Sequence, residues 1–322
     1  MILILSMELR KLGNSELEIY PLCFGGNVFG WTLDERESFK ILDAFTDSGL
    51  NFIDTANSYS HWVQGNKGGE SETILGNWMK RSGKRDQIIL ATKVGSNLGE
   101  DNKGLSKKYI LRAAEESLRR LQTDYIDLYQ SHYDDPETPI EDTLEAYAQL
   151  IKEGKVRVIG ASNFSRERLE KSLEISEKLG IPRYECLQPE YNLYSREHYE
   201  KELEEFILEK NIGVITYYSL ASGFLTGKYR SEEDFHKSPR GRGMKKYMNE
   251  RGFRIIKALE EVAQEYNAKP ATIALAWLIS RPGITAPIAS ATKPEQLHQL
   301  VQATLINLDP KAIDKLNLAS AY

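Results

Sequence analysis

The chain has 322 residues, of which 41% are hydrophobic and 28% are charged, and its formal net charge is −5. This is an ordinary composition for a globular protein and provides enough chain for a large buried core. The slightly negative charge gives no support to nucleic acid or an anionic membrane surface as a partner.

The N-terminal segment is apolar but short. It is too short for a signal peptide and lacks a basic leader, and no apolar run in the chain approaches the ~18 residues of a membrane span. Ordered-looking sequence begins at Met7, so residues 1–6 are expected to be a disordered leader, and a cytoplasmic location follows by default. Glu8–Leu12 and Leu17–Tyr20, joined by Gly13-Asn14-Ser15, predict a β-hairpin that caps the floor of the fold.

Short apolar runs then alternate with amphipathic stretches along the chain. Most runs are rich in Ile, Val, Leu and aromatic residues, as strands buried on both faces should be. The runs are Tyr20–Phe24, Asn51–Asp54, Gln87–Lys93, Tyr125–Gln130, Val156–Ala161, Glu185–Tyr191, Gly213–Tyr218 and Ile284–Ile288. Between them, helices are predicted over Glu35–Ser48, Ile110–Leu121, Glu141–Lys152 and Asn249–Tyr266.

Eight strand–helix units favour an α/β protein built as one (β/α)8 TIM barrel domain over residues 1–322. The step between the last two strands is about twice as long as the others and contains Tyr229–Gly252, which is interpreted as a long loop after strand 7. A doubly wound dinucleotide-binding sheet would carry G-x-G-x-x-G after its first strand, and Gly25–Gly30 does not match. Gly223–Tyr229 likewise fails the P-loop pattern.

Polar residues stand where the apolar runs end. The active site of a (β/α)8 barrel forms at the C-terminal ends of its strands, so these residues should converge on one mouth. They are Asp54 followed by Tyr59, Lys93, His132, Ser162-Asn163 and Tyr217-Tyr218, and the sixth run carries Gln188 within it.

Several local motifs are distinctive. They are Phe52–Ala56 with Tyr59, Ala91–Lys93, Tyr129–His132, Val158–Phe164, Gln188–Asn192, Leu225–Tyr229 and Ala291–Leu297. In this order the sequence resembles the aldo-keto reductase superfamily over nearly its whole length. It is most similar to the longer bacterial members near the potassium-channel β-subunit branch.

The resemblance implies a catalytic tetrad of Asp54, Tyr59, Lys93 and His132, with no metal. Hydride transfer to a carbonyl leaves an alkoxide that needs a proton from a positioned acid, and Tyr59 is the expected donor. A nearby ammonium favours a phenolate, so Lys93 is expected to lower the pKa of Tyr59. Asp54 would pair with Lys93, and His132 would orient the substrate oxygen.

The resemblance also implies a nicotinamide cofactor. Ser162, Asn163 and Gln188 would bind the carboxamide, and Tyr217 would stack on the ring. The remaining expected cofactor contacts are Gly26, Asn27, Leu220, Gly223, Lys228, Ser290 and Thr292. Lys293, supported by Gln296, would pair with a 2′-phosphate, which favours NADPH/NADP+ over NADH.

This chain departs from the family pattern at two places on the cofactor side. Residues 217–220 read Tyr-Tyr-Ser-Leu where Tyr-Ser-Pro-Leu is common, and Gln299-Leu300 stand where the family often has Glu-Asn. Recognition of adenine must therefore differ from the family pattern. Arg230, Arg240 and Arg242, in the loop after strand 7, either fold over the dinucleotide or form a solvated charged loop.

The substrate pocket is the least readable part of the sequence. Trp31, Trp62 and Tyr191 follow strands 1, 2 and 6 and are expected either to line an apolar mouth or to pack beneath loops. The stretch His61–Gly69 is a longer loop than compact members have, and it is expected to shape selectivity.

Two functions stay open at this stage. The first is an NADPH-dependent reductase acting on small aldehydes or ketones, and the second is a cofactor-binding, β-subunit-like partner protein with weak or no turnover. A metal-dependent barrel hydrolase is disfavoured because only His132 of the five histidines stands at a strand end. Cys23 and Cys186 lack metal-ligand spacing and are expected to be reduced interior thiols. The protein is expected to be a monomer or a homo-oligomer.

Overall fold

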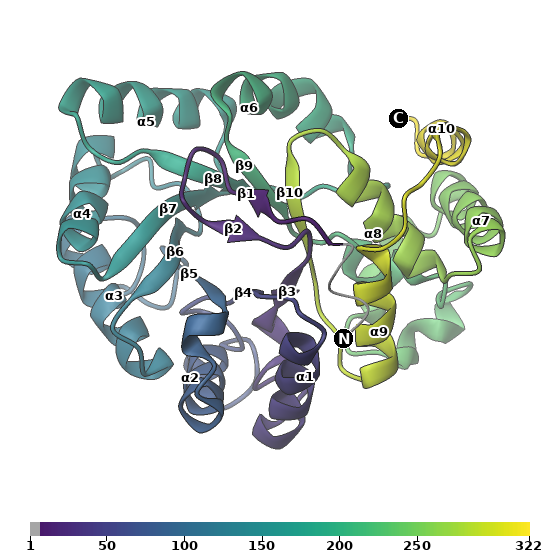
Figure 1. Cartoon of the computed structure of the whole chain (residues 1–322), viewed down its shortest axis with the longest axis horizontal. Coiled ribbons are helices and arrows are strands. Elements are labelled where there is room, and N and C mark those ends of the chain that lie inside the picture. The colour runs from purple at the N-terminus through teal and green to yellow at the C-terminus, as the bar shows by residue number, and fades with distance from the viewer. Residues whose placement is uncertain (1–6) are drawn as a thin grey trace.

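A computed structural model describes residues 7–322. The leader predicted over residues 1–6 lies outside the described residues. Figure 1 shows a ring of strands surrounded by helices, with the N-terminal hairpin crossing one end of the ring.

Eight parallel strands close into a barrel in the order β10-β3-β4-β5-β6-β7-β8-β9. They are β3 (Cys23–Gly25), β4 (Phe52–Asp54), β5 (Ile89–Val94), β6 (Ile126–Ser131), β7 (Val156–Ser162), β8 (Tyr184–Gln188), β9 (Gly213–Thr216) and β10 (Ile284–Ala289). The hairpin consists of β1 (Arg10–Lys11) and β2 (Glu18–Ile19), which pair antiparallel. The predicted (β/α)8 barrel with an N-terminal hairpin is therefore confirmed.

Ten α-helices of the described part of the chain surround the barrel or follow it. They are α1 (Glu35–Asp47), α2 (Glu70–Ser82), α3 (Lys107–Leu121), α4 (Ile140–Lys152), α5 (Arg166–Leu179), α6 (Glu204–Lys210), α7 (Glu250–Glu265), α8 (Pro270–Ser280), α9 (Pro294–Ala303) and α10 (Pro310–Ala319). Short helical turns are η2 (Gly26–Val28), η3 (Arg85–Gln87), η4 (Tyr199–Leu203), η5 (Ala221–Thr226), η6 (Glu232–Lys237) and η7 (Gly241–Tyr247). None of the helices in residues 7–322 combines the length and the apolar character needed to cross a bilayer.

Several of the helices begin where the sequence supplies a capping side chain. The Asp34 carboxylate accepts a hydrogen bond from the Glu37 backbone N–H, and the Asp34 backbone N–H donates to the Glu37 carboxylate. Together they form a capping box at the start of α1. Ser106 and Ser165 cap α3 and α5 in the simpler way. These local signals fix where each helix leaves its loop, and therefore how long each loop over the barrel mouth is.

The long connection after β9 is ordered rather than irregular. It contains η5, η6 and η7 before α7 begins, and Met244 and Tyr247 are buried against the rest of the molecule. The sequence predicted the length of this segment. Its short helices escaped prediction because their few apolar residues are anchored by distant contacts, such as the stacking of Tyr247 on Phe224.

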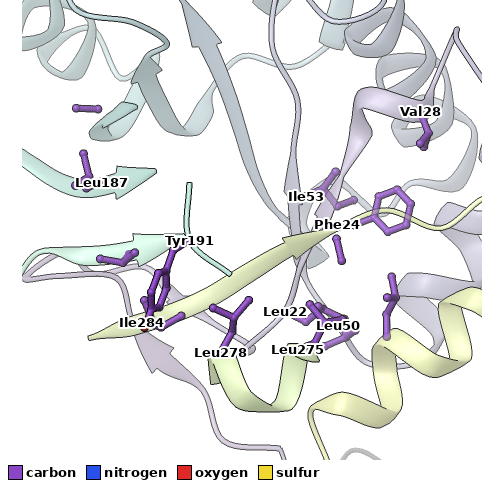
Figure 2. Packing of buried hydrophobic residues seen from close by; sticks show 14 of the residues in the cluster. Leu22, Phe24, Val28, Leu50, Ile53, Leu187, Tyr191, Leu275, Leu278 and Ile284 are labelled. Atoms are coloured by element: carbon purple, nitrogen blue, oxygen red, sulfur yellow. The ribbon is translucent and has the colours of Figure 1, made fainter. Parts of the chain in front are cut away.

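Two apolar layers hold the barrel together. The larger one lies between the strands and the helices, and Figure 2 shows part of it, including Phe24 and Ile53 of the strands and Leu275 and Leu278 of α8. The smaller one fills the barrel floor, where Leu12, Leu17 and Ile19 of the hairpin region pack on inward-facing strand residues. The hairpin therefore caps the floor as predicted.

Candidate active site

The barrel interior changes from apolar to polar over a distance of two residues along several strands. Floor residues Phe52, Ala91, Leu128 and Cys186 are followed two positions later by Asp54, Lys93, Gln130 and Gln188. Side chains two apart on a strand point the same way, so all four polar groups face the interior, one layer above the floor. The exposed fraction of each polar residue is 2% or less.

A glycine on β7 makes room for this polar layer. A Cβ on Gly160 would lie 3.1 Å from Gln130 Cγ and 3.1 Å from Cys186 Cβ. Both contacts are tighter than ordinary van der Waals distances. Gly160 thus occupies the inward position on its strand without displacing the amide side chains of its neighbours.

Three members of the predicted tetrad form one hydrogen-bonded group. Lys93 Nζ donates to Asp54 Oδ2 at 2.6 Å, to the Tyr59 hydroxyl at 2.8 Å and to the Thr55 carbonyl at 2.8 Å. The Tyr59 hydroxyl donates to Asp54 Oδ2 at 3.2 Å. Lys93 therefore uses all three of its N–H bonds, which fixes the ammonium against the phenol oxygen.

The other carboxylate oxygen of Asp54 is held by two amides. Gln130 Nε2 donates to Asp54 Oδ1 at 3.2 Å, and Gln188 Nε2 donates to the same atom at 3.1 Å. Gln188 Nε2 also lies 3.2 Å from Gln130 Oε1, to which it donates. Gln130 was not among the site residues predicted from the sequence. The available signal was its place two residues after Leu128, the same step that separates Ala91 from Lys93.

The electrostatic setting of Tyr59 reverses one expectation. Burial, followed by the charge of Asp54, raises the pKa of the Tyr59 phenol well above its ordinary value. Burial lowers the pKa of Lys93, and the opposing charge of Asp54 only partly offsets this effect. The net shift is therefore opposite in direction to the one expected from Lys93 alone, because burial and a carboxylate oxygen 3.2 Å from the phenol oxygen outweigh the ammonium.

His132 follows β6 and lies beside Tyr59, with ring centroids 6.1 Å apart. Its Nδ1 is 2.8 Å from Ser96 Oγ and 3.5 Å from Ser58 Oγ. Burial and the charge of Lys93 lower the pKa of the imidazole well below its ordinary value. All four predicted tetrad residues are thus brought together at one end of the barrel, with the imidazole neutral.

The residues predicted to bind the nicotinamide also converge. Ser162 Oγ donates to the Gln188 carbonyl at 2.9 Å, and Asn163 Nδ2 donates to the His132 carbonyl at 3.0 Å. The Tyr217 hydroxyl donates to Asn163 Oδ1 at 2.8 Å. Asn163 has a φ of 58°, a left-handed conformation that Asn tolerates better than most residues. This turn presents the Asn163 side chain at the exposed rim of the mouth.

The chain after β9 makes a tight turn rich in left-handed residues. Tyr218, Ala221, Ser222 and Gly223 all have positive φ. Such backbone is costly for residues other than glycine and gathers at functional sites. A Cβ on Gly223 would meet only the side chain of Lys228, with Nζ at 3.7 Å, so the turn and this lysine face the same open space.

The first and last strands meet at a further predicted group. Ser290 Oγ lies 2.7 Å from the Gly25 carbonyl oxygen and 2.8 Å from Asn27 Oδ1, the two acceptors within reach of its single hydroxyl hydrogen. A Cβ on Gly26 would lie 3.0 Å from the Asp54 carbonyl oxygen, so this position favours glycine. Gly26, Asn27 and Ser290 therefore lie together beside the tetrad, although they are far apart in the sequence.

The last predicted group is at the start of α9. Gln296 Oε1 accepts hydrogen bonds from the Thr292 backbone N–H at 2.8 Å and from its hydroxyl at 3.1 Å. Gln296 therefore braces the turn that presents Lys293, which is exposed. Within residues 7–322, neither Lys293 nor Lys228 forms an ion pair with a carboxylate.

The aromatic residues around the mouth partly differ from the expectation. Trp31 and Trp62 pack edge to face with centroids 5.6 Å apart, and Trp62 is 6.2 Å from Tyr59. The guanidinium of Arg240 lies 5.0 Å from the Trp31 ring, so the segment after β9 folds onto the loop after β3. Tyr133, which was not predicted from the sequence, is half exposed and stacks on His132 with ring centroids 4.9 Å apart.

Tyr191 is not part of the mouth, which corrects the prediction of a substrate contact there. It has no exposed surface, packs on Tyr199 and Trp277, and donates its hydroxyl to Glu200 at 2.7 Å. Figure 2 shows Tyr191 within the packed apolar layer. Its position three residues after β8 suggested the mouth, but the chain turns there into the outer core.

Comparison with known proteins agrees with this architecture. The model of the aldo/keto reductase family matches residues 21–320. An uncharacterized oxidoreductase of Bacillus subtilis, YrpG, is 35% identical over 97% of this chain and 95% of its own. A probable voltage-gated potassium channel subunit beta of rice is 31% identical over 96% of this chain and 95% of the rice protein. L-glyceraldehyde 3-phosphate reductase of Escherichia coli O157:H7 is 32% identical over 92% of this chain and 87% of the reductase. The chain, with its closed barrel and its Asp–Tyr–Lys–His mouth, belongs to the aldo/keto reductase family of oxidoreductases.

Proposed function

We propose that this protein reduces aldehydes or ketones to alcohols with NADPH, and that Tyr59 is the general acid. The observation that carries the proposal is the position of the Tyr59 hydroxyl, 2.8 Å from Lys93 Nζ and 3.2 Å from Asp54 Oδ2, at the mouth of the barrel. A phenol held this way at a barrel mouth is suited to deliver a proton to a substrate oxygen.

In the proposed reaction, the bound reduced nicotinamide supplies the hydride that adds to the carbonyl carbon. The C=O π electrons move to oxygen, and the resulting alkoxide takes the proton of Tyr59. The phenolate left behind is stabilised by the ammonium of Lys93, which already donates to the phenol oxygen. Asp54 keeps Lys93 oriented, and solvent returns a proton to Tyr59 after the alcohol leaves.

His132 supports the same step as a neutral hydrogen-bond donor. Its lowered pKa keeps the imidazole uncharged near neutral pH. A neutral donor beside Tyr59 orients the carbonyl oxygen without competing as a proton source. Trp31 and Trp62 would shield the reacting carbonyl from water and form the apolar part of the substrate contact.

The side chains around the mouth fit a nicotinamide dinucleotide. The Gln188 side chain uses its N–H groups on Asp54 and Gln130, which leaves its oxygen to accept from a carboxamide NH2. Ser162 and Asn163 supply further polar atoms at the same place, and Tyr217 supplies an aromatic face. These are the groups needed to hold and orient a flat amide-bearing ring.

Cationic side chains further along the mouth fit the phosphates. Lys228, beside the left-handed turn that ends at Gly223, would meet the pyrophosphate together with the backbone N–H groups of that turn. Gly26, Asn27 and Ser290 would line the opposite side. Lys293, exposed at the N-terminus of α9, would pair with a 2′-phosphate, and this is the basis of the proposed preference for NADPH over NADH.

The test follows NADPH absorbance with a panel of aldehydes, ketones and sugars. Tyr59→Phe is expected to reduce turnover roughly 100- to 10,000-fold, the usual contribution of a general acid, while NADPH binding is retained. Tyr129→Phe is a matched control, because the Tyr129 hydroxyl is buried and has no partner in the described residues. Wild-type turnover in Tyr59→Phe would remove Tyr59 as the acid.

A second function is favoured by one observation. Two plant relatives, from rice and Arabidopsis thaliana, are named as probable voltage-gated potassium channel subunits beta, and each is just over 30% identical to this chain. This chain would then bind the dinucleotide chiefly as a partner protein. NADPH binding without turnover on any carbonyl of the panel would favour this reading. A cytoplasmic location and a monomeric or homo-oligomeric state stay predictions from the sequence.

A further inference from the structure

Two serines outside the predicted tetrad, Ser58 and Ser96, lie beside His132 Nδ1. Ser96 Oγ is 2.8 Å from His132 Nδ1, and Ser58 Oγ donates to Ser96 Oγ at 3.2 Å. Both serines are buried, with exposed fractions of 3% for Ser58 and 8% for Ser96. They come from the loops after β4 and β5, so three consecutive strand ends contribute to this contact.

The directions of these hydrogen bonds follow from the hydrogens available. Each serine has one hydroxyl hydrogen. The Ser58 hydroxyl donates its hydrogen to Ser96 Oγ. The hydroxyl hydrogen of Ser96 is then available to donate to His132 Nδ1. Ser58 Oγ itself lies 3.5 Å from Nδ1, so a second hydroxyl is also near this nitrogen. If Nδ1 instead carried a proton and donated to Ser96, the hydrogen of the buried Ser96 hydroxyl would have no other acceptor among the side chains of the described residues, which is unfavourable.

The surroundings of the ring keep it neutral, so one nitrogen must accept. The ionisable groups facing His132 are Lys93 of β5, Tyr59 and His61 of the loop after β4, and Tyr133 of its own loop. None of them is a carboxylate that would stabilise a second proton on the imidazole. The backbone also favours the contact, because Gly95 has a φ of 110° and turns the chain between Val94 and Ser96.

We propose that Ser58 and Ser96 are positioning residues that set the tautomer of His132. They hold Nδ1 as a hydrogen-bond acceptor, so Nε2 carries the proton and donates to the substrate carbonyl oxygen. This inference deepens the proposed function and rests on it for the identity of the substrate group. The tautomer itself is a property of the resting protein and can be measured without substrate.

The experiment is 15N NMR of the protein labelled at the imidazole nitrogens of its five histidines, with the His132 signals assigned by His132→Asn. In the wild type we expect an unprotonated-type shift at Nδ1 and a protonated-type shift at Nε2. Ser96→Ala should move both shifts toward a mixture of tautomers, and Ser96→Thr, which keeps a hydroxyl, should restore them. Loss of this one hydrogen bond should also reduce kcat about 3- to 10-fold.

Ser131→Ala is the matched control. Ser131 precedes His132 in the chain and is buried, but its hydroxyl lies 2.8 Å from the phenol oxygens of Tyr147 and Tyr184. Its removal should leave the His132 shifts and kcat unchanged. If Ser96→Ala fails to fold, Ser58→Ala decides, because loss of the outer hydroxyl should move the shifts the same way by a smaller amount.

Two results would overturn the proposal: a proton on Nδ1 in the wild type, or His132 shifts that do not respond to Ser96→Ala or Ser58→Ala. Failure of the proposed function gives a different pattern. In that case the wild type shows no turnover with NADPH and the carbonyl panel, while the nitrogen shifts still report on the two serines.

Discussion

The two ends of the barrel are built from the same strands and have opposite character. At the floor, Phe52, Leu128 and their neighbours pack on Leu17 and Ile19 of the hairpin region in a cluster of apolar side chains. Two residues further along, Asp54 and its partners form a buried polar layer in which each charge depends on another. The floor gains its stability chiefly from the burial of apolar surface, whereas the mouth keeps a charged pair out of water, which costs free energy unless the pair is hydrogen-bonded.

From this contrast we expect truncation of a side chain to have different effects at the two ends of the barrel. A floor residue leaves a cavity, and its loss should reduce stability without affecting the reaction. A mouth residue leaves an unpaired charge or donor, and its loss should affect both. The mouth also contains strained backbone, at Tyr218, Ala221 and Ser222.

The largest effect is expected from Lys93→Met. It removes the cation that stabilises the phenolate and leaves Asp54 charged and buried, so kcat should fall roughly 100- to 10,000-fold. The free energy of unfolding should fall by about 3–5 kcal/mol. Steady-state kinetics and urea unfolding measure the two losses.

The double variant Asp54→Asn/Lys93→Met separates these two losses. With no charge left in the pair, most of the stability should return while turnover stays low. Recovery of turnover in the double variant would show that Lys93 serves only to neutralise Asp54.

The floor counterpart is Leu17→Ala. Leu17 is 1% exposed and packs inside the floor cluster, so its truncation should cost about 2–5 kcal/mol of unfolding free energy through the cavity that it leaves. Turnover at a temperature where the variant is folded should stay near the wild-type value. A large fall in kcat in this folded variant would mean that floor and mouth are coupled, contrary to the comparison.

A smaller effect is expected at the rim. Lys293→Ala removes an exposed cation that makes no ion pair in the described residues, so the fold should be unaffected. The Kd for NADPH should rise about 10-fold, which corresponds to one lost charge-assisted hydrogen bond, while the Kd for NADH should hardly change. Fluorescence titration with each dinucleotide measures both, and an equal rise for the two would remove the 2′-phosphate role.

The smallest effect should be that of pH on reduction. The proposed reaction needs Tyr59 protonated and His132 neutral. Burial raises the pKa of Tyr59 above its ordinary value, so the phenol loses its proton only at strongly alkaline pH. Burial lowers the pKa of His132 below its ordinary value, so the imidazole becomes charged only at a more acidic pH than a free histidine. We expect kcat/KM for the carbonyl to be nearly constant from about pH 6.5 to 10.

A pH–rate profile in a constant-ionic-strength buffer checks this plateau. A clear fall in kcat/KM between pH 7 and 9 would show that the phenol titrates near its ordinary value or below it. Lys93 would then dominate over burial and Asp54, as the sequence had suggested.

Particular residues show how far prediction from the sequence reached. Asp54 and Lys93 were found because each ends an apolar run that is recognisable as a strand, and Gln188 was found as the polar residue within the sixth run. Gln130 ends the run Tyr125–Gln130, but it was overlooked because His132, two residues later, was taken as the polar end of that strand. Ser58 and Ser96 lie in loops and carry no periodic signal, so only the approach of three loops reveals their contact with His132.

The errors have physical causes of the same kind. Tyr191 follows β8 closely, yet the backbone turns outward and buries it beside Trp277, which depends on α8 far along the chain. The pKa of Tyr59 depends on the summed effects of burial, Asp54 and Lys93, and residue types alone do not provide that sum. The segment after β9 is ordered by contacts such as Arg240 on Trp31, which join residues about 200 positions apart.

The sequence by itself determined the eight-stranded barrel, the hairpin at its floor and the strand ends that carry the tetrad. Strand periodicity and helix caps are local, and local patterns can be read from neighbouring residues. The tertiary structure alone decided which side chains form hydrogen bonds with one another, which hydroxyls lie beside His132 Nδ1, and which aromatic residues reach the mouth. These outcomes depend on distances of a few ångströms between residues that only closure of the barrel brings together.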